Sequence, residues 1–198
     1  MQEVKYNQIS VVKVKPNNMG DTRTAGRIPT RPEFREANNE HIDDVRRVME
    51  QIAAEINWRG TVHDWTKTDY EAMFYKDFCE FLEPDALGVK VEDRMPFTDR
   101  DWYRLHIRKE RHHLKSNPPE DVNLIDILEM ITDCVCAGRA RSKLGAVYPI
   151  EISDEMLREA FENTVKLIKD HVERDENVYD EDGGRLEVPN KSDESLSV

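Results

Sequence analysis

The sequence predicts an all-α protein with one helical domain, and three observations support this fold class. Apolar residues recur every three or four positions through most of residues 38–172, which is the period of one face of an α-helix. Charged residues make up 35% of the chain and apolar residues 38%, a balance that suits amphipathic helices with charged outer faces. A chain of 198 residues has the size of one ordinary domain.

The predicted bundle has about five to seven helices and lies between an irregular N-terminal arm, residues 1–37, and a flexible acidic C-terminal tail, residues 173–198. The arm contains one β-prone run, Ile9–Val14, followed by prolines and glycines that interrupt helices. Residues 84–98 carry similar interruptions and predict a loop or lid. The clearest helices are predicted from Asn38 or Asn39 to Gly60, from Thr68 or Asp69 to Pro84, from Thr98 or Asp99 to Leu114, from Val122 to Arg141, and from Ser153 to Val172.

The composition limits the partners that the protein can have. Acidic residues outnumber basic residues by 41 to 29, and the formal charge of −12 disfavours nucleic-acid binding, because an acidic surface repels a phosphate backbone. A small anionic substrate remains compatible, since a bound dication and a few basic residues can invert the potential inside one pocket. Three cysteines give no paired disulfide framework, and no run reaches the roughly 20 apolar residues of a membrane span. We therefore expect a soluble, cytoplasmic protein without a membrane partner.

Histidines and aspartates are scattered through the predicted helices, and five of the six histidines lie between His41 and His113. Imidazole and carboxylate groups bind divalent ions such as Mn, Fe, Co, Ni, Zn and Mg, and a hydrolase uses such an ion to activate water. His41 begins the apolar stripe of the first helix, where a lone histidine is more often structural. The adjacent pair His63-Asp64 follows Gly60 at a helix-to-helix junction, where both side chains can turn toward one ion.

Three segments carry, in order, a histidine, a His-Asp doublet and a late aspartate in a helix. They are His41-Ile42-Asp43-Asp44-Val45, Val62-His63-Asp64-Trp65-Thr66-Lys67, and Ile127-Leu128-Glu129-Met130-Ile131-Thr132-Asp133-Cys134-Val135-Cys136-Ala137. Over residues 38–172 this order resembles the HD-domain superfamily of metal-dependent phosphohydrolases, particularly its short phage-type or uncharacterised bacterial members. The resemblance implies an HD-domain-like helical bundle in which His41, His63, Asp64 and Asp133 bind the metal.

Asp126 is the alternative for the last of these ligands. It lies seven residues before Asp133 and therefore on almost the same helical face, so the helical period cannot separate the two. The residues that surround Asp133 favour it over Asp126.

His106, His112 and His113 lie in the interval between the doublet and the late aspartate. On a continuous helix His106 and His113 would share one face, whereas His112 would lie about 100° away. His106, His112 and His113 are candidates to bind a second ion or to contact a substrate phosphate. The alternative is a solvated basic helix face formed with Arg108, Lys109 and Arg111.

The implied chemistry assigns roles to several polar residues. Asp64 is predicted to orient or deprotonate the attacking water, with Lys67 near the phosphate and His113 as a further catalytic residue. The predicted substrate-binding residues are His112, Arg111 and Arg139.

The resulting hypothesis is a phosphohydrolase that depends on a divalent ion (Mn, Co, Ni, Fe, Zn or Mg) and acts on a nucleotide or similar small phosphate ester. One alternative is a phosphodiesterase for a cyclic nucleotide or signalling dinucleotide, which could use the same ligands. A second alternative is a non-catalytic HD-like interaction protein. A homo-oligomer is compatible with each of these hypotheses, but the sequence does not fix the oligomeric state.

Overall fold

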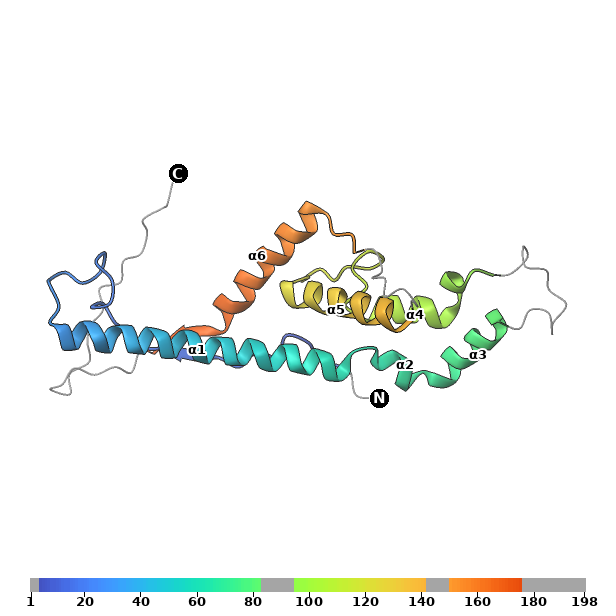
Figure 1. Ribbon diagram of the computed structural model, residues 1–198, viewed down its shortest axis with the longest axis horizontal. Helices are drawn as coiled ribbons and strands as arrows, with labels where there is room; N and C mark the ends of the chain where they lie inside the picture. The colour runs from blue at the N-terminus through green and yellow to red at the C-terminus, as the bar shows by residue number, and fades with distance from the viewer. Residues whose placement is uncertain (1–3, 83–94, 142–149, 176–198) are drawn as a thin grey trace. The chain divides into compact units, whose positions relative to one another are not determined.

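The computed structural model describes residues 4–82, 95–141 and 150–175, and these residues are mostly helical (Figure 1). The predicted helical class is therefore confirmed, whereas the HD-like arrangement stays a prediction. None of the described helices is both long and apolar enough to cross a membrane. The elements are β1 (Val12–Val14), α1 (Arg31–Val62), α2 (Trp65–Asp69), α3 (Glu71–Leu82), the 3-10 helix η3 (Phe97–Asp99), α4 (Asp101–Lys109), α5 (Leu124–Arg141), α6 (Asp154–Asp170) and β2 (Val172–Arg174).

The chain divides into two compact units. Unit 1 comprises Met1–Ile9 and Ile52–Lys169, and unit 2 comprises Ser10–Gln51 and Asp170–Val198, each as far as it is described. Most of the predicted loop 84–98 and of the predicted tail lies outside the described residues, although η3 forms near the end of that loop.

In unit 2, β1 and β2 pair in parallel, with Val12 opposite Val172 and Val14 opposite Arg174. The predicted β-prone run is thus a strand over three of its residues. The partner strand was not predicted, because three residues are too few to show the alternation of apolar and polar side chains that marks a strand.

The first helix begins at Arg31, earlier than the predicted start at Asn38 or Asn39. Thr30 and Glu33 form a capping box: the backbone N–H of Thr30 donates to Glu33 Oε2 at 2.7 Å, and the N–H of Glu33 donates to Thr30 Oγ1 at 3.4 Å. This reciprocal pair satisfies two donors at the start of the helix. The helix also continues past the predicted end at Gly60 to Val62.

The apolar core of unit 1 is formed by α5, α6 and the segment before α5. Ala160 on α6 is fully buried, and the core residues are Leu114, Val122, Ile127, Met130 and Ala160. Ser153 caps α6 as predicted, because its Oγ accepts the N–H of Met156 at 3.2 Å.

A buried ion-pair network centred on Arg59 holds α1 to α5. Arg59 is 1% exposed; its Nε donates to Glu55 Oε1 at 2.8 Å and its Nη1 to Asp126 Oδ1 at 2.6 Å. Arg111 donates two further hydrogen bonds of 2.8 Å to the Asp126 carboxylate. Arg59 Nη1 also lies 3.3 Å from Glu129 Oε2. A fully buried carboxylate is stable only when it is paired in this way.

The N-terminal segment completes this network. Asn7 has a left-handed backbone, with φ of 58°, which asparagine tolerates better than most residues. The N–H groups of Asn7 and Gln8 donate to the two oxygens of Glu55 at 2.7 and 3.0 Å. The Tyr6 ring lies 4.6 Å from the guanidinium of Arg59. This part of the predicted arm is therefore ordered against unit 1.

Replacing Arg59 with methionine is expected to lower the free energy of unfolding by about 3–5 kcal/mol, because it leaves buried carboxylates without their cation. Chemical denaturation in the presence of a chelator, followed by circular dichroism, measures the change. Arg46, on the same helix, forms only exposed ion pairs, so Arg46→Met is the matched control and should change little. Equal losses in the two variants would contradict a central role for the network.

Candidate functional site

The His63-Asp64 doublet lies at the junction between α1 and α2. Asp64 has a left-handed backbone, with φ of 58° and ψ of 26°, a conformation that costs most side chains free energy but that aspartate tolerates. His63 Nε2 lies 3.6 Å from Asp64 Oδ2, so the two neighbouring side chains meet at this junction.

The next contribution to the site comes from the end of α4. This helix ends at Lys109, earlier than the predicted end at Leu114, because Glu110 takes an extended conformation with φ of −93° and ψ of 121°. The Glu110 carboxylate is buried and accepts the backbone N–H and the hydroxyl of Thr66 at 2.9 and 2.7 Å. The chain after Glu110 therefore turns back toward the start of α2.

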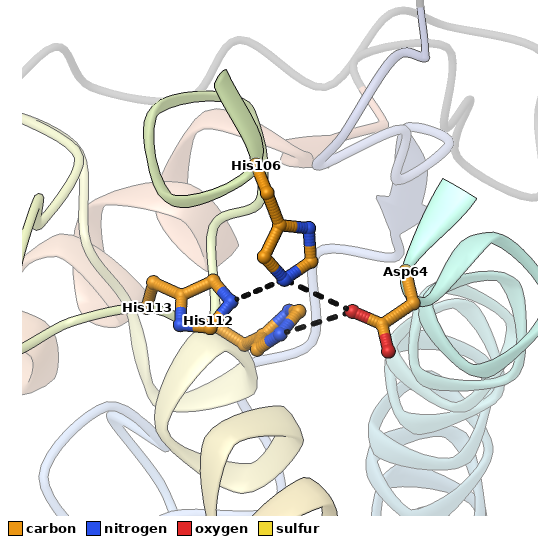
Figure 2. Close-up of side chains that lie close together, drawn as sticks. All are labelled: Asp64, His106, His112 and His113. Atoms are coloured by element: carbon orange, nitrogen blue, oxygen red, sulfur yellow. Dashed lines mark hydrogen bonds and ion pairs between the residues drawn. The ribbon is translucent and has the colours of Figure 1, made fainter. Parts of the chain in front are cut away.

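Because the helix ends early, His112 and His113 lie in the turn after α4, and Figure 2 shows them beside His106 and Asp64. Asp64 Oδ1 lies 3.5 Å from His106 Nε2 and 3.6 Å from His112 Nε2. His106 Nε2 and His113 Nε2 are 2.7 Å apart. One donor atom from each of the four residues lies within 4.8 Å of the others. We call these four residues the Asp64 cluster.

A second group of possible ligands overlaps the Asp64 cluster. One donor atom each from His63, His112 and Asp133 lies within 4.8 Å of the others, and His63 Nε2 is 3.5 Å from Asp133 Oδ1. The structure therefore brings three of the four predicted metal ligands, His63, Asp64 and Asp133, into one region of unit 1.

Glu129, one turn before Asp133 on α5, orients two of the imidazoles. Its Oε1 lies 2.9 Å from His63 Nδ1 and 3.3 Å from His112 Nδ1. A carboxylate only accepts hydrogen bonds, so the neutral form of each ring carries its proton on Nδ1 and keeps the Nε2 lone pair available. Carboxylates hold metal-binding histidines in this way.

Thr66 performs the same function for His106. Its single hydroxyl proton goes to Glu110 Oε1 at 2.7 Å, so Oγ1 must accept from His106 Nδ1, which lies 2.6 Å away. The Nε2 lone pair of His106 is then left facing His113 and Asp64. The ring is also stacked on Trp102, with centroids 4.7 Å apart and planes 14° apart.

The charge states of the imidazoles differ across the site. Burial lowers the pKa of His106 to about 3, with repulsion from His113 adding to the shift. Burial also lowers the pKa of His113 to about 4, with His112 adding to the shift. Both rings are therefore neutral at physiological pH, which is the form that binds metal ions. By contrast, the carboxylates of Asp133 and Glu129 raise the pKa of His63 to about 10.

Two polar atoms of the cluster lack a hydrogen bond within the described protein. They are Asp64 Oδ1 and His112 Nε2, both of which are buried, and His112 is 2% exposed. Buried polar groups are normally satisfied, so these two atoms are available to a ligand. Imidazole nitrogens and carboxylate oxygens together suit Mn, Fe, Co, Ni or Zn, and the residues therefore fit a divalent ion.

His41 does not join this group. It is exposed, belongs to unit 2, and lies on α1 about six turns before the doublet. Among the described residues, neither group of possible ligands includes His41, so its predicted role as a metal ligand stays a prediction. His106 and His112, by contrast, lie beside Asp64.

Asp126, the alternative to Asp133, has a structural position. It is fully buried, pairs with Arg59 and Arg111, and accepts the N–H of Asn123 at 2.9 Å. Its carboxylate is saturated by these donors, whereas Asp133 lies beside His63. The geometry therefore favours Asp133 as the candidate ligand.

The basic residues that were predicted to contact the substrate differ in their surroundings. Arg111 forms ion pairs with Asp126 and Asp121, so its guanidinium has a structural role, and its predicted substrate contact stays a prediction. Arg139 is exposed on α5. Lys67 forms an ion pair with Asp64 Oδ2, which leaves it next to the site.

Sequence reasoning missed Glu129, Thr66 and Glu110 as parts of the site. Glu129 could have been found from its spacing, because residues three and four apart on a helix share a face and it lies between Asp126 and Asp133. Thr66 and Glu110 gave no such indication, since their contact joins α2 to the end of α4.

The fold and the site together define a mostly helical protein with a buried cluster of imidazoles and carboxylates. Residues 31–174 match a family of unknown function, DUF5662, and the chain belongs to that family. Neither the curated proteins nor the solved structures gave a match to this chain.

Replacing Thr66 with valine keeps nearly the same side-chain shape but removes the hydroxyl that accepts a hydrogen bond from His106 Nδ1. We therefore expect His106 to occupy both neutral tautomers instead of one. Nitrogen-15 shifts of the ring in proton–nitrogen correlation spectra should move from one neutral tautomer toward a mixture. The free energy of unfolding should fall by about 1–3 kcal/mol for the lost buried hydrogen bonds.

The matched control for this variant is Thr68→Val, because Thr68 is exposed on the same helix. It should alter neither the His106 shifts nor the stability. An unchanged His106 tautomer in Thr66→Val would contradict the orientation that we assign to this ring.

Proposed function

We propose that the protein is a metal-dependent phosphohydrolase that acts on a nucleotide or similar small phosphate ester. The observation that carries the proposal is the Asp64 cluster, in which three imidazoles and a carboxylate oxygen without a hydrogen bond converge within 4.8 Å. The resemblance of the His63-Asp64 doublet and Asp133 to the HD-domain phosphohydrolases supports the same reaction class.

Two overlapping groups of residues would bind the ion. Nitrogens of His106, His112 and His113 with Asp64 Oδ1 would form one set of ligands. His63 with Asp133 would extend it, and the ion would then displace the second proton of the His63 ring. A bound divalent ion would lower the pKa of water from ~15.7 toward ~7 and would neutralise charge on the phosphoryl oxygens.

Asp64 has the geometry to handle the proton of the attacking water. Its Oδ2 is held by Lys67, while its Oδ1 has no hydrogen-bond partner. The reaction adds one water across the ester bond: the water oxygen bonds to phosphorus, the phosphorus–oxygen bond to the organic group breaks, and the departing oxygen takes up a proton. No oxidant or reductant is required. The ammonium group of Lys67, which pairs with Asp64, would contact the phosphate.

Replacing His112 with alanine is expected to weaken metal binding, because it removes a central nitrogen ligand. The loss should exceed about 10–100-fold, which is the effect of removing only the hydrogen-bond partner of a ligand. Orthophosphate release from a panel of nucleotides should fall in parallel. A chelator should abolish activity in the wild type, and added Mn, Co or Ni should restore it.

The control for this variant is His41→Ala, since His41 is exposed and lies outside the site. It should keep both the bound metal and the activity. A wild-type protein that retains no metal, or hydrolysis that survives both His63→Ala and Asp64→Asn, would refute the proposal. Asparagine is chosen because it also tolerates the left-handed backbone.

Replacing Glu129 with glutamine is expected to weaken metal binding by about 10–100-fold, because an amide no longer fixes the protons of His63 and His112 on Nδ1. Isothermal titration with Mn or Co measures the affinity, and circular dichroism checks the fold. Glu162→Gln, an exposed change on α6, serves as the control and should match the wild type. Equal affinities in the two variants would remove Glu129 from the site.

A further inference from the structure

A pocket of about 930 Å³ adjoins the candidate site in unit 1. Its lining includes His63, Asp64, Lys67 and Asp133 of the candidate site. Residues of α1 and α5 line the rest of it, among them the charged side chains of Arg59, Glu129 and Arg141. The polar groups of the proposed reaction therefore open into a much larger space than a phosphate needs.

The long walls of this pocket are mainly apolar. Ile56 and Gly60 line it from α1, and Leu128, Ala137 and Ala140 line it from α5. Small-molecule sites usually occupy 300–1,000 Å³ and combine apolar walls with a few polar groups. This pocket has that composition, because apolar side chains lie between its charged groups.

Gly60 is the least bulky part of the α1 wall. A Cβ atom added there would meet no heavy atom within 4 Å, and its φ does not lie in the left-handed region that requires glycine. Neither backbone strain nor tight packing therefore explains a glycine inside this helix. What glycine does provide is open space next to the candidate site.

We propose that this pocket binds the organic group of the phosphate ester, that this group is bulky and largely apolar, and that Gly60 sets its size limit. The inference rests on the proposed function, which puts the phosphate beside His63, Asp64 and Lys67. A polyhydroxylated group such as a sugar is disfavoured, because hydroxyls that face Ile56 and Leu128 would lose water without gaining hydrogen bonds there.

The test compares variants that fill the pocket with one that does not. Gly60→Leu narrows the pocket from the α1 side, and Ala140→Leu narrows it from the α5 side. If one of these variants does not fold, the other still tests the inference. Ala53→Leu is the matched control, because Ala53 is exposed on α1 and does not line the pocket. Circular dichroism melting checks that all variants are folded.

Two measurements are made on each full-length protein. The first is kcat/KM for 2-naphthyl phosphate, methyl phosphate and glucose 6-phosphate with Mn added. The second is binding of 2-naphthyl phosphate in the presence of a chelator, followed by its fluorescence. We expect the wild type to prefer 2-naphthyl phosphate to glucose 6-phosphate. In Gly60→Leu and Ala140→Leu the ratio of kcat/KM for 2-naphthyl over methyl phosphate should fall by about tenfold or more through KM.

The outcomes separate this inference from the proposed function. Hydrolysis with no preference for the apolar ester, or the same ratio in Gly60→Leu and Ala53→Leu, would overturn the pocket assignment while leaving the phosphohydrolase in place. If no variant hydrolyses any ester, the proposed function fails. In that case, binding of 2-naphthyl phosphate that weakens in Gly60→Leu but not in Ala53→Leu would still support the pocket, and unchanged binding would overturn it.

Discussion

The buried cation of Arg59 is the interaction on which the rest of unit 1 depends. It joins Glu55 on its own helix to Asp126 on α5, and it lies over the Tyr6 ring of the N-terminal segment. Charges of this kind are unstable inside a protein unless every partner is in place. The network therefore fixes the facing surfaces of α1 and α5, and the pocket and the candidate site lie along those same surfaces.

The network also reaches the site through one carboxylate. Glu129 Oε2 lies 3.3 Å from Arg59 Nη1, and Glu129 Oε1 lies 2.9 Å from His63 Nδ1. Burial opposes ionisation of Glu129, yet hydrogen bonds from His112 and His63 lower its pKa to about 2. An ionised Glu129 is thus stabilised by Arg59 on one side and can hold imidazole protons on the other. Glu129 thus connects the Arg59 network directly to the imidazoles of His63 and His112.

The sequence predicted most of the helices because their apolar faces carry the 3.6-residue period, but it predicted their ends poorly. Because of the Thr30–Glu33 capping box, α1 begins earlier than predicted. Because Glu110 is extended, α4 ends before His112. The early end of α4 matters for the candidate site. The prediction assumed a continuous helix, and on such a helix His106, His112 and His113 would not meet. Local pattern identified the doublet and Asp133 as candidates. It could not exclude His41, because only the course of the chain in space shows which histidines share a unit.

The register of α5 determines which role each of its acidic residues takes. Asn123 caps this helix by accepting the N–H groups of Ile125 and Asp126, while its own N–H donates to the Asp126 carboxylate. With Asp126 fixed in the ion network, Glu129 follows one turn later beside His63, and Asp133 one turn after that. A shift of one residue would rotate all three by about 100° and would remove the carboxylates from the imidazoles. The cap and the buried ion pairs therefore serve the candidate site as directly as its own ligands do, because they set the only register in which the site can form.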